Sequence, residues 1–228
     1  RANSADTDAN PVPLAAALDP LLMKGMPKAI TAATGMDALT HAVEAFINRW
    51  PHADTEQHCV AAVRMIFGNL QRAYDDGSDM EAREAMALAS FYAGLAFTKA
   101  YVGYVHAFSH KLGGMYGVPH GLANAITLPY VLDFIKDAPL ARERLAQLAV
   151  VIGAGTAGEP HDILAQRFIE RVRELNRGVG IPDKVAALKP ADVPTVARAA
   201  LIEAARDYPV PKNMSLGEAE TLLQRMLA

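Results

Sequence analysis

The stretch MDALTHAVEAFIN, residues 36–48, has the spacing of an amphipathic helix. Its apolar side chains Met36, Leu39, Val43 and Phe46 recur once per helical turn and would form one stripe. No alternation of strand-like and helix-like segments surrounds it, so a parallel sheet is not implied. The sequence therefore predicts an all-α fold, a multi-helix bundle with at most one short strand near residues 13–18.

Prolines, glycines and capping residues divide the chain into helices. Pro27 suits a first turn, Gly35 should break or reset that helix, and Gly113, Gly114 and Gly117 should form a tight turn. The capping-box pattern occurs twice, at Ser78/Glu81 and Ser215/Glu218. The expected helices beyond residue 47 are 54–74, 79–99, 103–112, 120–136, 139–150, 160–177, 192–207 and 215–227.

Composition excludes several classes of protein. The 228 residues are 51% hydrophobic and 21% charged, which is normal for a globular protein. The net charge of −3 gives no electrostatic reason to expect nucleic acid or a membrane as partner, and no apolar run reaches the ~18 residues of a membrane span. The single cysteine, Cys59, is expected to be buried and fits a reducing cytoplasm. Because the chain opens on arginine, we expect its natural start to be missing.

The segment GAGTAG, residues 153–158, matches the glycine pattern of a dinucleotide-binding turn. That turn needs a strand before it and a helix directly after it. Here Leu145, Leu148 and Ile152 precede it at helical spacing, and Pro160 follows. A flexible loop is the favoured interpretation.

The polar face of residues 36–48 carries Asp37, His41, Glu44 and Asn48. Asp37 and His41 are one helical turn apart, so both side chains can reach one divalent metal ion. The alternative is a solvated polar face with a weak Asp–His contact, and this helix alone favours that alternative.

A second segment, residues 101–124, contains His106, His110 and His120 in apolar surroundings. Buried polar groups need partners, and a charged imidazole at a helix start is disfavoured, so metal-bound neutral rings fit better than three separately satisfied core histidines. Any two of the three could join Asp37 and His41, and the adjacent pair His106/His110 is the simplest choice. Such a donor set suits Fe(II), Zn(II) or a similar ion.

Two motifs resemble the iron-containing, or group III, alcohol dehydrogenase family. They are GMDALTHAVEAF at 35–46 and HAFSHKLGGMYGVPHGLANAITLPYV at 106–131. The resemblance implies a dehydroquinate synthase-like C-terminal domain that takes part in NAD(P)-linked interconversion of a primary alcohol and an aldehyde. It assigns the ligands of Fe2+, in some members Zn2+, to Asp37, His41, His106 and His120. It also implies a proton-relay role for His110 near the nicotinamide and a place in the substrate pocket for Phe97.

The resemblance also implies a division of the chain. Residues 1–26 would lead in from a missing N-terminal nucleotide-binding domain, and residues 27–228 would be the helical metal-binding domain, with two sub-bundles dividing near 151–160. NAD or NADP would bind through the missing domain, because no GGGS-type motif occurs here. The expected partners are a small alcohol or aldehyde and the chain's own N-terminal domain, with a homodimer among the expected assemblies.

Two other classes of function compete with this interpretation. The dipeptide His161-Asp162 could belong to a helical His-Asp type metal phosphohydrolase, but the nearest upstream histidine is His120. A non-catalytic helical module would bind no metal tightly. Lys99 and Lys111 could meet a cofactor phosphate, although solvated lysines are favoured.

Overall fold

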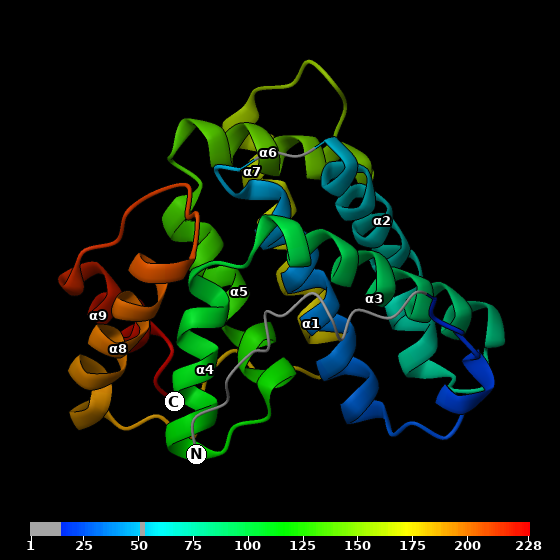
Figure 1. Cartoon of the computed structure of the whole chain (residues 1–228), viewed down its shortest axis with the longest axis horizontal. Helices are drawn as coiled ribbons and strands as arrows, with labels where there is room; N and C mark the ends of the chain where they lie inside the picture. The colour runs from blue at the N-terminus through cyan, green and yellow to red at the C-terminus, as the bar shows by residue number, and fades with distance from the viewer. Residues whose placement is uncertain (1–14, 51–52) are drawn as a thin grey trace.

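The computed structural model describes residues 15–50 and 53–228, and in these ranges the chain is helical with no strand (Figure 1). The predicted all-α fold is thereby confirmed. A short strand was expected near residues 13–18. Residues 15–18 do not form a strand, and residues 13 and 14 lie outside the described residues. The helices are α1 (Lys28–Ile47), α2 (Ala53–Asp75), α3 (Met80–Ala100), α4 (Tyr104–Tyr116), α5 (His120–Ile135), α6 (Pro139–Val151), α7 (His161–Gly178), α8 (Val193–Asp207) and α9 (Leu216–Arg225), with 3-10 turns at Pro20–Met23 and Pro190–Asp192.

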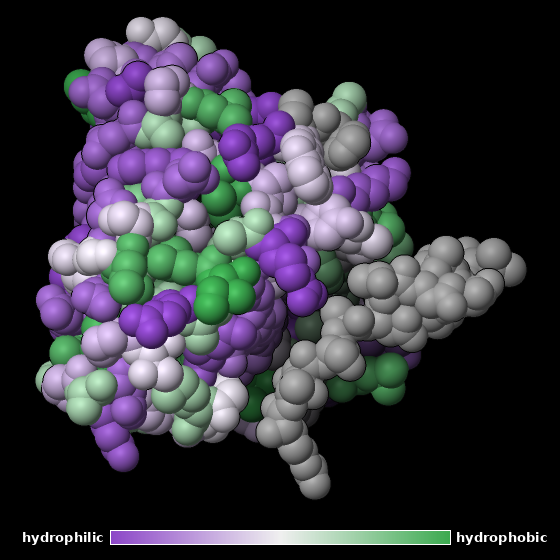
Figure 2. Space-filling model, turned by 60° about the vertical axis from the view of Figure 1, so that its left-hand side comes forward, coloured by the Kyte–Doolittle hydropathy of each residue, from purple (hydrophilic) through white to green (hydrophobic). Residues whose placement is uncertain are grey.

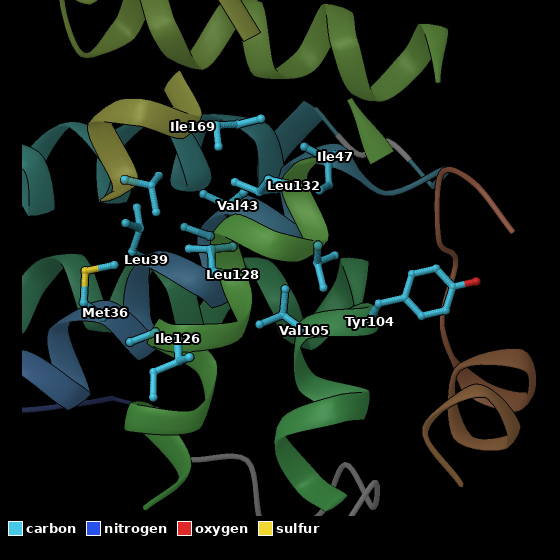
Figure 3. Close-up of a cluster of buried hydrophobic side chains, with 14 of the residues drawn as sticks. Met36, Leu39, Val43, Ile47, Tyr104, Val105, Ile126, Leu128, Leu132 and Ile169 are labelled. Atoms are coloured by element: carbon cyan, nitrogen blue, oxygen red, sulfur yellow. The ribbon is translucent and has the colours of Figure 1, made fainter. Parts of the chain in front are cut away.

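Helix α1 is the central element, since it packs against α2, α3 and α5. Helix α4 lies between α5 and α8, α6 packs on α7, and α8 packs on α9 (Figure 1). The apolar stripe of α1 is buried as predicted, with Met36, Leu39 and Val43 fully inaccessible. Figure 3 shows Leu39 and Val43 in one buried cluster with Leu128 and Leu132 of α5. The stripe therefore holds α1 beside α5, and both helices carry residues of the site described below.

Gly35 does not break α1, which runs unbroken from Lys28 to Ile47. A Cβ at Gly35 would overlap the side chain of Leu70 on α2, so this glycine permits a close helix contact. A second glycine prediction was also wrong, because α4 continues through Gly113 and Gly114. Only Gly117, with a φ of 68°, takes the left-handed conformation that ends the helix.

The two predicted capping boxes have different outcomes. Ser215 and Glu218 form a complete capping box at the start of α9. Asp79, not Ser78, caps α3, and its side chain accepts a hydrogen bond from the backbone N–H of Ala82. The N-cap of α3 is therefore a carboxylate, one residue after the expected serine.

The glycine-rich segment 153–158 forms turns between α6 and α7, so a helix and not a strand precedes it. The loop prediction is confirmed, and the division into sub-bundles near this loop stays a prediction. Cys59 is completely buried, and burial raises the pKa of its thiol to about 12.

None of the described helices is long and apolar enough to span a membrane alone; α3 and α4 meet that test only together, across a bend of 105°. Figure 2 shows one face of the molecule, where hydrophobic residues lie in separate groups among hydrophilic ones. Leu21 and Leu22, in the turn before α1, are 65% and 85% exposed.

Candidate metal centre

Three helices bring one carboxylate and three imidazoles together. Asp37 and His41 stand one turn apart on α1, His106 comes from the first turn of α4, and His120 is the first residue of α5. In the described part of the chain, these four form the only group of three or more histidine, cysteine or acidic residues whose ligand atoms lie within 4.8 Å of one another. His110, the fifth candidate, is not in this group.

The spacing of the four ligand atoms suits one small cation. Asp37 Oδ1 lies 3.6 Å from His41 Nε2, 3.7 Å from His106 Nε2 and 3.6 Å from His120 Nε2. A tetrahedral ion with ligand bonds of about 2.0–2.2 Å requires ligand atoms about 3.3–3.6 Å apart. The three separations from Asp37 are at or close to the upper end of this range, so the donor set suits a divalent ion such as Fe(II) or Zn(II).

Burial keeps two of the imidazoles neutral. Loss of hydration lowers the pKa of His41 to about 3, and it lowers the pKa of His106 to about 3 as well. A neutral imidazole has one nitrogen with a free lone pair, which is the form that binds metals. His106 is 2% exposed whereas His120 is 43% exposed, so the cluster is open to solvent on the His120 side.

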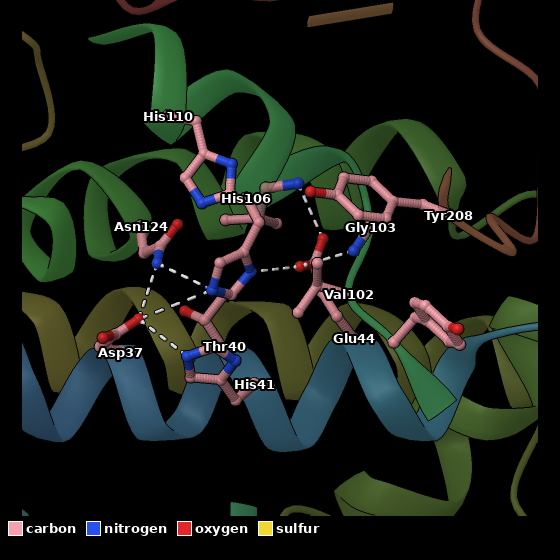
Figure 4. Close-up of polar contacts among 12 residues, drawn as sticks. Asp37, Thr40, His41, Glu44, Val102, Gly103, His106, His110, Asn124 and Tyr208 are labelled. Carbon is pink, nitrogen blue, oxygen red and sulfur yellow. Dashed lines mark hydrogen bonds and ion pairs between the residues drawn. The ribbon is translucent and has the colours of Figure 1, made fainter. Parts of the chain in front are cut away.

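Glu44 fixes the orientation of His106 and was not predicted to do so. Its carboxylate accepts hydrogen bonds from the backbone N–H groups of Gly103 and Val105, at 2.9 and 2.7 Å, and lies 2.7 Å from His106 Nδ1 (Figure 4). With Nδ1 donating to Glu44, the lone pair of His106 Nε2 faces Asp37. Burial raises the pKa of Glu44 to about 7.

The expectation of a solvated polar face on α1 is wrong. Glu44 and Asn48 are each only 2% exposed. The amide of Asn48 donates to the carbonyl oxygens of Ala100 and Tyr101, where α3 ends. Both side chains therefore hold the α3–α4 junction in place beside α1.

Asn124, on α5, was also missed. Its amide nitrogen lies 2.7 Å from Asp37 Oδ1 and 3.1 Å from His106 Nε2 (Figure 4), and 3.0 Å from His120 Nε2. One carboxylate oxygen and two imidazole nitrogens thus converge on one amide nitrogen, in the arrangement that they would take around a cation. An imidazole nitrogen has only one lone pair, so with an ion bound Asn124 can keep its bond to Asp37 alone.

Phe97 and His110 each stack on a different histidine of the cluster. The Phe97 ring stacks on His41 at 4.1 Å, which gives one wall an apolar surface. The His110 ring stacks on His120 at 5.3 Å, and its Nδ1 lies 2.6 Å from Glu203 on α8. Lys111 pairs with the same Glu203 at 2.5 Å and is 28% exposed, so it is partly solvated and has an acidic partner within the chain.

Gly121 determines how closely α5 approaches α1. A Cβ at this position would overlap the carbonyl oxygen of Ala33 and lie 3.3 Å from the Cβ of Asp37. The neighbouring His120 reaches the cluster because no side chain separates the two helices here.

We expect Gly121→Ala to push α5 away from α1 and to weaken zinc binding at least about tenfold, with a loss of stability of about 1–3 kcal/mol from overpacking. Calorimetric titration with Zn2+ and urea unfolding measure the two effects. Gly114→Ala is the control, because a Cβ there meets nothing within 4 Å. Equal zinc affinity in the two variants would contradict this role of Gly121.

The alternative metal site at His161 and Asp162 receives no support. Both residues are exposed at the start of α7, and neither belongs to the cluster of ligand atoms. A helical His-Asp type phosphohydrolase is therefore not favoured.

Comparison with known proteins agrees with the geometry. A family model described as Fe-containing alcohol dehydrogenase family, C-terminal, matches residues 31–227. The 1,3-propanediol dehydrogenase of Klebsiella pneumoniae is 45% identical over 185 residues, which cover 80% of this chain and 47% of that protein. The chain thus spans about half the length of the curated relatives it matches.

Solved structures show the same fold. The crystal structure of a 1,3-propanediol oxidoreductase matches with a TM-score of 0.85 and 40% identity, over 91% of this chain and 54% of that chain. A sulfoacetaldehyde reductase from Bifidobacterium kashiwanohense, solved in complex with NAD+, matches with a TM-score of 0.79 and 28% identity. The match covers 91% of this chain and 53% of that chain. The family match and these relatives show that the chain belongs to the iron-containing alcohol dehydrogenase family, of which it represents the C-terminal part.

Proposed function

We propose that this chain is the metal-holding half of an NAD(P)-linked dehydrogenase that interconverts a primary alcohol and an aldehyde. The observation that carries the proposal is the spacing of about 3.6 Å from Asp37 Oδ1 to three imidazole nitrogens. Family membership supports Fe2+ as the ion, and the same donors suit Zn2+.

Asp37, His41, His106 and His120 would hold the ion. A divalent ion there supplies Lewis-acid chemistry, which lowers the pKa of an alcohol and polarises the carbonyl in the reverse direction. Three neutral imidazoles and one carboxylate leave such a site with a net charge of about +1, so it stays electrophilic. The cluster is open beside His120, and we propose that the substrate oxygen approaches from that side.

His110 is proposed to exchange the proton of the alcohol with solvent. Its ring lies against His120 and is 40% exposed, so it can contact both the site and water. Phe97 covers His41 with an apolar surface, which suits the carbon chain of a short alcohol. Relatives named for 1,3-propanediol and sulfoacetaldehyde support a small substrate of this class.

The nicotinamide cofactor is proposed to bind to the half of the relatives that this chain does not match. One relative is solved with NAD+, and the chain covers 53% of it. The turn at 153–158 follows a helix and offers no strand–glycine–helix cradle for a pyrophosphate. Leu21 and Leu22, exposed just before α1, are apolar surface that such a domain could cover.

We therefore expect the 228-residue chain to bind Zn2+ or Fe2+ but not NADH or NADPH. Without a bound nicotinamide held close to the substrate carbon, it lacks a positioning effect worth about 7–11 kcal/mol of barrier and should show no alcohol oxidation. Calorimetric titration with each cofactor, followed by an assay with short alcohols and saturating metal, tests this. Micromolar binding of either cofactor would contradict the assignment of the nucleotide site to another domain.

A further inference from the structure

Glu203, on α8, makes three hydrogen-bonding contacts beside the metal centre. Its Oε1 lies 2.6 Å from His110 Nδ1 and accepts from the Tyr208 hydroxyl at 2.6 Å. Its Oε2 lies 2.5 Å from the Lys111 ammonium. The side chain is 18% exposed, so this is a largely enclosed carboxylate with a partner on each oxygen.

The surroundings of Glu203 keep it ionised. Burial raises its pKa, but the hydrogen bonds from His110, Lys111 and Tyr208 outweigh burial and lower the pKa to about 2. An ionised carboxylate only accepts hydrogen bonds, so the hydrogen between Glu203 and His110 must sit on His110 Nδ1. In the neutral ring the lone pair is then on Nε2.

The His110 ring lies against the rings of two proposed ligands. It stacks on His120 with an interplanar angle of 17°, and its centroid is 5.9 Å from that of His106. His106 has the same arrangement with Glu44, which lies 2.7 Å from its Nδ1. Two glutamates from different helices thus fix the Nδ1 side of two adjacent imidazoles, one a proposed ligand and one not.

We propose that Glu203 is a positioning residue for proton transfer, which holds His110 in the Nδ1–H tautomer and leaves Nε2 free to accept a proton. This inference rests on the proposed function of His110. It gives α8 a role in the site, because α8 packs on α4 and supplies the only contact to His110 Nδ1 among the described residues. Lys111, paired with the other carboxylate oxygen, would keep the carboxylate in the required orientation.

The test is the tautomer of His110, read by proton–nitrogen NMR of the 15N-histidine-labelled chain at about pH 8, where an ordinary imidazole is neutral. The wild-type chain should carry the hydrogen on Nδ1. Glu203→Ala, which removes the acceptor, should shift the population to the Nε2–H form. Tyr208→Phe, which leaves the carboxylate in place, is the control and should resemble wild type.

A second measurement separates this inference from the proposed function. Zinc affinity by calorimetry should be the same in wild type, Glu203→Ala and Glu203→Gln, because Glu203 touches none of the proposed ligands. Absence of zinc binding in wild type would refute the metal centre, while the tautomer could still be read without metal. An Nε2–H ring in wild type, or an unchanged Nδ1–H ring in Glu203→Ala, would overturn the role of Glu203. The wild-type spectrum alone reveals whether the ring carries its hydrogen on Nε2, so the test stands even if Glu203→Ala does not fold.

Discussion

The variant His120→Ala is expected to lose nearly all bound metal, falling from about one ion per chain in the wild type to almost none after dialysis. His120 supplies one of the four converging ligand atoms, and its Nε2 lies 3.6 Å from Asp37 Oδ1. Removal of a residue that merely orients a ligand already costs about 10- to 100-fold in affinity, so loss of a ligand should cost more than about 100-fold. Elemental analysis and competitive titration with a chelator measure the change.

His110→Ala is the matched control for this prediction. His110 is a histidine of similar exposure, 40% against 43% for His120, and the two rings are stacked. It should keep nearly the whole metal content, because it is not one of the four convergent residues. Equal loss from both variants would mean that His110 is a ligand and that the assignment on α4 and α5 is wrong.

Glu44→Ala is expected to destabilise the metal-free chain by about 3–5 kcal/mol, since each buried donor left unpaired costs about 1–3 kcal/mol. The two backbone N–H groups at Gly103 and Val105 would lose their acceptor, and the variant would also leave a cavity. His106 would lose the contact that orients it, so zinc affinity should fall about 10- to 100-fold as well. Urea unfolding of the metal-free protein and zinc calorimetry measure the two losses separately.

Glu218→Ala provides the comparison for Glu44. Glu218 also accepts a hydrogen bond from a backbone N–H, that of Ser215, but it does so at the exposed start of α9. Loss of this capping contact should cost only about 1 kcal/mol and leave zinc affinity unchanged. An equal loss of unfolding free energy in Glu44→Ala and Glu218→Ala would contradict the claim that the buried hydrogen bonds of Glu44 stabilise the α3–α4 junction.

The sequence was sufficient to predict the helices because their apolar stripes recur at helical spacing and tertiary packing agrees with that local pattern. It was less informative about glycines. Gly35 was expected to break or reset its helix, and Gly121 was not singled out, but each permits a close contact between helices, with Leu70 and with Ala33. Such contacts depend on the neighbouring element, which local propensity does not contain.

The candidate site could be predicted only in part. The residues alone indicated a metal but left the choice among His106, His110 and His120 open, because helical spacing makes the adjacent pair equally suitable. The resemblance assigned the four residues that the fold brings together, and their role as ligands stays a proposal. Asn124 stands one turn after His120, which is a local signal, but nothing local marks Glu203, which lies 93 residues after His110.

The most direct test of the metal centre is an anomalous-scattering crystal structure of the chain loaded with Zn2+, measured at the zinc absorption edge. We expect one anomalous peak per chain, about 2.0–2.2 Å from an Asp37 carboxylate oxygen and from the Nε2 atoms of His41, His106 and His120. A peak bound by His110 in place of His120, or a peak elsewhere with these four residues free, would contradict it.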